Sequence, residues 1–122
     1  MNSDIFVPEL ETETSNDYHS GNRILTRVAG VTFDGRQAVI ARLSIGEEIL
    51  LRREPTNPYD PNAISVECQN GWQIGYLNRH LAAMFAPFFD NYQQTVHGNI
   101  HCITGSLRPG YSLGVVITFN VP

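Results

Sequence analysis

The chain has 122 residues and a formal net charge of −4, a length that fits one domain with a sizeable core. It contains no run near the roughly 18 apolar residues of a membrane span, and no basic-then-apolar leader, so we expect a soluble, cytoplasmic protein. Short runs of Val, Ile, Thr, Tyr and Phe between Gly and Pro predict a mainly β fold.

The charge is unevenly distributed along the chain. Residues 1–22 contain five acids and no base, whereas residues 23–122 contain seven acids and eight bases. All eight bases are arginine, which binds phosphate through paired hydrogen bonds and stacks on base faces, although genome bias can produce the same composition. The net negative charge therefore does not argue against a nucleic-acid surface on residues 23–122.

Residues 1–22 are polar, acidic and without periodicity, and they predict a flexible tail ahead of a domain at 23–122. The domain should open with a strand at Arg23–Phe33. Apolar residues at one-turn spacing predict a short helix at Arg36–Leu43, with a second strand as the alternative. A further strand is expected at Glu47–Arg53.

Asn70-Gly71 lies between two alternating apolar runs, Ile64–Cys68 and 72–76, and predicts a type I′ hairpin. Asn78 should cap a helix that Pro87 kinks or restarts near Ala86. The expected apolar face of that helix consists of Leu81, Met84, Phe85 and Phe88.

Two more alternating strands are expected at Gln94–Thr104 and Leu113–Val121, joined by a loop that carries Arg108 and Tyr111. The predicted total is about six strands with one or two short helices. This count favours a small, partly open barrel of OB-like or SH3-like kind, in the mainly β class.

The most unusual stretch runs from Arg52 to Ile64 and contains three prolines within seven residues, so neither a helix nor a central strand passes through it. Asn and Asp residues between the prolines can form Asx-type turns. We expect a stiff loop that presents Tyr59 and Asp60 beside Arg52 and Arg53, although such clusters also serve as plain connections between strands.

The motif E-P-T-N-P-Y-D-P-N-A-I at 54–64, followed by Q-I-G-Y-L at 73–77 and Leu81-Ala82, resembles the HIRAN domain over about residues 23–121. This module occurs in certain SWI/SNF-type helicases and as a free-standing bacterial protein. The resemblance implies an OB-like barrel. It also implies a module that binds the 3′ end of single-stranded DNA, as the helicase member does when it helps to remodel stalled replication forks.

By the same resemblance, Asp60 matches the carboxylate that accepts a hydrogen bond from the free 3′-hydroxyl, and Tyr59 matches a pocket tyrosine. Asn57 matches an asparagine of the same loop, and Phe33 falls at an aromatic position that stacks on a nucleotide. These four residues are the predicted centre of the site.

Thr32 stands where the helicase member has an arginine, and Arg36, Arg52 or Arg53 are the candidates to supply the missing phosphate contact. Arg79 keeps one of two cationic positions near the start of the second helix. Tyr111 completes the predicted DNA-binding residues.

The chain lacks a recognisable catalytic triad, P-loop, GxGxxG or CxxC motif, so we expect a binding module without cofactor, and no enzyme. His97 and His101 should share one face of a strand and Cys102 the other, which makes a zinc site there unfavourable. Cys68 and Cys102 are expected to be small buried side chains, with a disulfide as the alternative. The rival function is an interaction module that partners a helicase or nuclease on another chain without binding DNA, and no membrane partner is expected.

Overall fold

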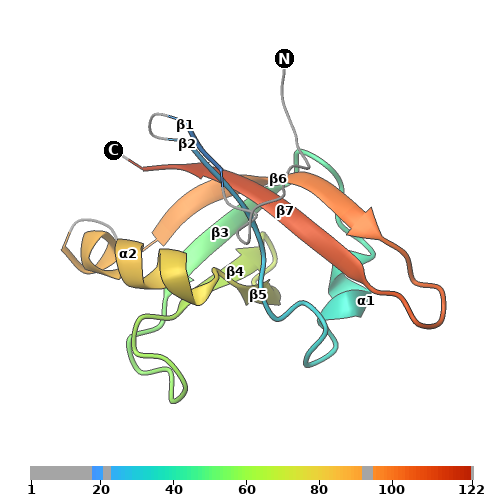
Figure 1. Ribbon diagram of the computed structural model, residues 1–122, viewed down its shortest axis with the longest axis horizontal. Helices are drawn as coiled ribbons and strands as arrows, with labels where there is room; N and C mark the ends of the chain where they lie inside the picture. Colours follow the sequence, from blue (N-terminus) through green and yellow to red (C-terminus); the bar gives the residue numbers. More distant parts are fainter. Residues whose placement is uncertain (1–17, 21–22, 92–94, 122) are drawn as a thin grey trace.

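One antiparallel sheet of seven strands forms the body of the protein, in the order β1-β2-β7-β6-β3-β4-β5 (Figure 1). The computed structural model describes residues 18–20, 23–91 and 95–121. The strands are β1 (Tyr18–Ser20), β2 (Arg23–Arg27), β3 (Glu48–Arg53), β4 (Ile64–Cys68), β5 (Gln73–Tyr76), β6 (Thr95–Gly105) and β7 (Leu113–Asn120). The two helices are α1 (Arg36–Ile40) and α2 (Arg79–Asn91).

The sheet curls into a partly open barrel because β5, the strand at one edge of the sheet, pairs with the segment that follows β2. The Ala29 N–H donates to the Tyr76 carbonyl at 2.7 Å, and the Tyr76 N–H donates back to the Ala29 carbonyl at 2.9 Å. This contact needs Gly75, since a Cβ there would lie 2.3 Å from the Ala29 oxygen. The predicted mainly β, OB-like barrel with two short helices is confirmed.

The N-terminal elements differ in extent from the prediction. The segment expected to be a tail, 1–22, includes the short strand β1, which pairs with β2; residues 1–17 and 21–22 lie outside the described residues. The first long strand ends at Arg27, because the chain turns at Gly30 with φ of 73°. The helix predicted at Arg36–Leu43 exists but ends at Ile40, and the strand alternative is wrong.

A side-chain amide fixes α1 against the barrel. Gln37 accepts a hydrogen bond from the Leu113 N–H at 2.7 Å and donates to the Leu113 carbonyl at 3.0 Å and the Val31 carbonyl at 2.9 Å. It therefore joins the start of β7 to the loop that precedes α1.

The β4–β5 hairpin lies where Asn70-Gly71 predicts it, but its turn type differs. A type I′ turn needs positive φ at both central residues, and in the described part of the chain the only non-glycine with positive φ is Asp34. The Gly71 N–H donates to the Cys68 carbonyl at 2.9 Å, and Gly71 has a φ of 90°. This pattern belongs to a three-residue loop with a left-handed glycine. The Asn70 side chain stabilises it by accepting from the Trp72 N–H at 3.0 Å.

Asn78 caps α2 as predicted, accepting from the Leu81 N–H at 2.9 Å. The predicted restart near Ala86 is wrong, because the helix runs unbroken through Pro87 from Arg79 to Asn91. Burial of Ala86 and Phe89 on either side of the proline offsets the hydrogen bond that it removes.

The predicted apolar face of α2 is confirmed for Leu81, which is buried, and for Phe85 and Phe88, which are partly buried and pack against the core; Met84 does not belong to it. The buried residues are Leu81, Ala82, Ala86 and Phe89. Met84 is 48% exposed, while Phe85 is partly buried and packs edge-on against Phe119 with ring centroids 6.0 Å apart. The side that faces the core thus includes two alanines, with Phe89 as its largest fully buried side chain.

The position of the buried face of α2 can be tested by stability measurements. Phe89→Ala should lower the free energy of unfolding by about 3–5 kcal/mol, because it removes a fully buried ring and leaves a cavity. Met84→Ala, the control, should cost less than about 1 kcal/mol. Urea unfolding followed by circular dichroism measures both, and equal losses would contradict the observed face.

Candidate nucleic-acid interface

The loop between β3 and β4 is held by its own side chains. The Asn57 Oδ1 accepts from the backbone N–H groups of Tyr59 at 2.8 Å and Asp60 at 3.1 Å, and the Asp60 Oδ1 accepts from the Asn62 N–H at 2.9 Å. Two successive Asx-type turns therefore fix the backbone at Tyr59 and Asp60. The stiff loop predicted from the prolines is present.

Tyr76, at the end of β5, ties this loop to the barrel. Its hydroxyl donates to the Glu54 Oε1 at 2.9 Å and accepts from the Asn57 Nδ2 at 3.3 Å. The same Asn57 nitrogen lies 3.0 Å from the Glu54 carboxylate, so the three polar groups form a closed triangle. Burial raises the pKa of Tyr76 above its usual 10.0. The Glu54 carboxylate, which accepts a hydrogen bond from the Tyr76 hydroxyl, raises this pKa further.

Arg36 ties the other loop of the site to the same tyrosine. Its guanidinium lies 5.4 Å from the centre of the Tyr76 ring, and its Nη1 donates to the Gly30 carbonyl at 2.7 Å. Its Nη2 donates to the Gln73 side chain. Arg36 is only 7% exposed, so it braces the turn that presents Phe33 and does not itself face solvent.

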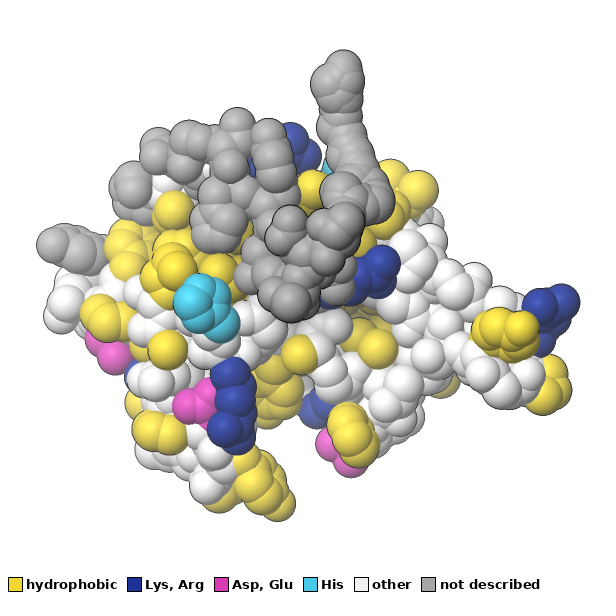
Figure 2. Space-filling view, viewed as in Figure 1, with side chains coloured by type: hydrophobic (Ala, Val, Ile, Leu, Met, Phe, Trp, Pro, Cys, Tyr) yellow, Lys and Arg dark blue, Asp and Glu magenta, His cyan; other side chains and the backbone are white. Residues whose placement is uncertain are grey.

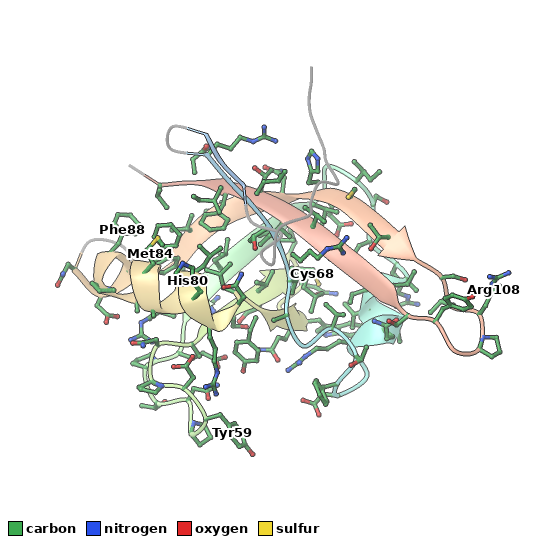
Figure 3. The ribbon with its side chains drawn as sticks, in the orientation of Figure 1. Tyr59, Cys68, His80, Met84, Phe88 and Arg108 are labelled. Atoms are coloured by element: carbon green, nitrogen blue, oxygen red, sulfur yellow. The ribbon has the colours of Figure 1, made fainter. Side chains whose placement is uncertain are left out.

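Two aromatic rings stand out from these loops. Tyr59 is 84% exposed and Phe33 is 64% exposed. Figure 3 shows Tyr59 at the tip of the β3–β4 loop, pointing away from the sheet. In the space-filling view of Figure 2, hydrophobic side chains lie at the tips of both loops along the lower edge of the molecule, with a notch between them.

Arg79 brings a positive charge to the β3–β4 loop. It is the first residue of α2, it is exposed, and its Nη2 donates to the Tyr59 carbonyl at 3.3 Å. The structure thus brings together Asn57, Tyr59, Asp60 and Arg79, and connects them through Tyr76 to Arg36 and the Phe33 turn.

Three of the predicted residues lie outside this group. Arg53 points inward, forms an ion pair with Asp90 of α2 at 3.0 Å, and donates to the Ala63 carbonyl at 3.3 Å. Arg52 pairs with Glu67 across the β3–β4 ladder at 3.3 Å. Tyr111 lies beside Arg108, whose guanidinium is 4.9 Å from its ring, and Figure 3 shows Arg108 on the β6–β7 loop, far from Tyr59.

Sequence reasoning missed two residues that organise the site. Glu54 and Tyr76 were both part of the quoted motif, but neither was given a role. Their contact joins positions 22 residues apart, and only the pairing of β4 with β5 brings them together. A glutamate that opens the loop and a tyrosine that ends the next hairpin are the signals that could have suggested it.

Cys68 and Cys102 are both free thiols, so the disulfide alternative is wrong. Across residues 18–20, 23–91 and 95–121, no three His, Cys, Asp or Glu side chains gather closely enough to hold a metal ion. Neither helix in this part of the chain is long and apolar enough to cross a membrane.

The fold and this motif can now be compared with known proteins. A family model of the HIRAN domain matches residues 21–119. The chain belongs to the HIRAN family. Membership of this family implies a DNA-binding module.

Solved structures agree with this assignment. The crystal structure of the HIRAN domain of human HLTF superimposes with a TM-score of 0.58 and 28% identity, covering 80% of this chain and 74% of that one. A crystal structure of a protein from Lactobacillus plantarum gives a TM-score of 0.59 and 25% identity, covering 82% and 93% of the two chains.

Similar sequences lie inside much longer proteins. The chain is 50% identical to a helicase-like transcription factor of Oryctolagus cuniculus over 52 residues. These residues make up 43% of this chain and 5% of that protein. It is 33% identical over 84 residues to a Fanconi-associated nuclease 1 homolog of Arabidopsis thaliana, 69% of this chain and 9% of that protein. The HIRAN chain thus spans less than a tenth of either relative.

The role of Tyr76 can be tested with Tyr76→Phe, which keeps the ring and the backbone pairing but removes the hydroxyl. The free energy of unfolding should fall by about 1 kcal/mol, because the Glu54 and Asn57 groups lose a shared partner. Urea unfolding measures this loss.

The same variant tests the pKa of Tyr76. Because folding raises this pKa, its contribution to stability is present below the unfolded value near 10.0 and is lost as pH rises through the folded value. Alkaline titration followed by ultraviolet absorbance should show one of the five tyrosines ionising late, and Tyr76→Phe should remove that step. An unchanged titration curve would contradict the assignment.

Proposed function

We propose that this HIRAN chain binds single-stranded DNA and recognises its 3′-hydroxyl end through the β3–β4 loop. The observation that carries the proposal is the setting of Asp60. One carboxylate oxygen is used by the Asn62 N–H, and the carboxylate forms no ion pair within the described residues. It lies next to the exposed ring of Tyr59 and to a backbone contact of Arg79.

An unpaired carboxylate is a poor neighbour for a phosphate and a good acceptor for a hydroxyl. A strand that ends in a 3′-hydroxyl can donate to Asp60, whereas a 3′-phosphate meets it charge against charge. The remaining donors of the Arg79 guanidinium can bind a phosphate further along the strand. Tyr59 and Phe33 offer exposed rings on which bases can stack whatever their sequence.

The same module lies within a protein named as a helicase-like factor and within one named as a nuclease. Both names support a role in DNA repair or replication-fork processing, with the helicase or nuclease activity supplied outside the 122 residues of this chain. A domain that stacks the terminal bases of a DNA strand would hold that end in position for such an enzyme.

Asp60→Asn provides the decisive test, because the amide keeps the oxygen that accepts from Asn62 and replaces the other carboxylate oxygen with an uncharged NH2 group. Fluorescence anisotropy with short strands that end in either 3′-hydroxyl or 3′-phosphate should show at least about tenfold tighter binding of the hydroxyl end by the unmodified protein. Asp60→Asn should reduce that preference to within about twofold.

The matched control is Glu47→Gln, since Glu47 also accepts from a backbone N–H, that of Ser44 at 3.0 Å, but lies outside the loop. It should keep the full preference. Equal binding of both ends by the unmodified protein would count against 3′-end recognition, and absence of binding to either end would favour a module that contacts only proteins.

Stacking can be tested separately from end recognition. Tyr59→Ala should weaken binding of both kinds of end by about 1–3 kcal/mol, while Tyr59→Phe should bind nearly as tightly as the unmodified protein. Because the ring is 84% exposed, neither change should alter thermal stability by more than a few degrees. A loss in Tyr59→Phe as large as in Tyr59→Ala would show that the hydroxyl, and not the ring, makes the contact.

A further inference from the structure

Two arginines that are not part of the candidate site lie on the outer side of the sheet. Arg23 and Arg27 begin and end β2, and both are exposed. Residues four apart in a strand share one face and lie about 13 Å apart, because each residue advances the chain by about 3.3 Å. Neither arginine belongs to the predicted site.

Each of these guanidinium groups is held by a neutral partner on a neighbouring strand. The Arg23 Nε donates to the Thr118 Oγ1 of β7 at 2.9 Å, and the Arg27 Nη1 donates to the Thr104 Oγ1 of β6 at 3.3 Å. Within the described residues neither forms an ion pair, unlike the arginines at 36, 52 and 53. A hydroxyl partner sets the direction of a guanidinium without neutralising its charge.

Gly114 makes the longer of these contacts possible. Arg27 must cross β7 to reach Thr104, and a Cβ at Gly114 would lie 2.7 Å from the Thr104 Oγ1 and 3.3 Å from the Arg27 Nη1. The Arg27 side chain can pass over β7 at this position because Gly114 has no side chain.

The face around both arginines carries no opposing charge from its own strands. None of the residues of β2, β6 and β7 is Asp or Glu. Burial lowers the pKa of His101, and the nearby charge of Arg23 lowers it further. Burial raises the pKa of Cys102, and the charge of Arg27 opposes that rise. The charges of the two arginines of β2 thus act on these two side chains of β6.

The segment that carries Arg27 leads along the chain to the candidate site. From Arg27 the chain runs through residues 28–30 directly into the turn that presents Phe33, and Figure 1 shows it descending from β2 to the loop before α1. A strand whose end lies at the β3–β4 and Phe33 loops can therefore continue past Arg27 towards Arg23.

We propose that Arg23 and Arg27, oriented by Thr118 and Thr104, form a strip that binds the sugar–phosphate backbone of nucleotides on the 5′ side of the bound end. The direction of the strand rests on the proposed function, and the binding of phosphate rests on the strip itself. Arginine suits this role because its planar fork of donors matches phosphate oxygens.

The experiment compares strand lengths with the full chain. Anisotropy is measured with oligothymidylates of about 4 and about 12 nucleotides, each with a 3′-hydroxyl and with a 3′-phosphate, over a series of salt concentrations. The variants are Arg23→Gln, Arg27→Gln and the double variant. Arg42→Gln is the control, because Arg42 is an exposed arginine outside the strip with no ion pair in the described part of the chain.

The long strand should bind the unmodified protein more tightly than the short one. Each strip variant should weaken long-strand binding about three- to tenfold and leave short-strand binding unchanged. The slope of log K against log salt should become shallower by about 0.7 for each arginine removed. Thr104→Val keeps both charges and should weaken the long strand by a smaller factor with an unchanged slope, which tests the strip even if a Gln variant proves unstable.

Long-strand binding that is unchanged in all three strip variants, or equally weakened in Arg42→Gln, would overturn the strip. Absence of any gain with length in the unmodified protein would overturn it as well. If the strip variants lose the long strand but the unmodified protein shows no end preference, the strip stands and 3′-end recognition fails; a preference that persists in Asp60→Asn removes only the role of Asp60. If Asp60→Asn removes the end preference but the strip variants keep full long-strand binding, the strip is overturned and 3′-end recognition stands.

Discussion

The site depends on one residue at the end of β5. The backbone of Tyr76 pairs with Ala29 and closes the barrel, its hydroxyl bonds to Glu54 and Asn57, and its ring lies beneath the guanidinium of Arg36. The closure of the barrel and the positions of two loops therefore share a single side chain. Loops placed by a rigid scaffold are a common location for binding residues, and here the scaffold reaches both loops through one ring.

Five of the eight arginines fall into two groups. Arg36 and Arg53 are buried and use their donors on backbone carbonyls and polar side chains, so they hold loops in place. Burying a guanidinium is costly unless such partners are present, and these contacts offset part of that cost, while the Nε atom of each of the two lies buried without a hydrogen-bond partner in the described residues. Arg79 and the two arginines of β2 remain exposed, without ion pairs in the described residues, and carry the charge that is available to a ligand.

Features set by neighbouring residues could be predicted from the sequence. The cap at Asn78 and the turns at Asn57 and Asp60 need only a short side chain and a backbone N–H two or three residues away. The face of α2 could be predicted only in part. Leu81, Phe85 and Phe88 face the core as their spacing predicts, but Ala82 and Ala86 are buried while the larger Met84 is half exposed, so side-chain size misplaced one edge of the face. The role of Tyr76 depends on a pairing across the sheet and that of Arg53 on a contact with Asp90 of α2, and no local pattern contains either.

The positions of these charges bear on Thr32, the position at which the resemblance to the family predicts an arginine in the helicase member. None of the three arginines predicted as substitutes presents a free charge beside it: Arg36 and Arg53 are buried, and Arg52 pairs with Glu67. On the proposed function, binding strength then comes from Arg79 beside the β3–β4 loop and from cations further along the strand. The strip on β2 lies directly before the Phe33 turn in the chain, so a loss at the end of the strand can be offset over its length. A HIRAN domain of this kind would discriminate ends through Asp60 and gain affinity from the number of phosphates that it contacts.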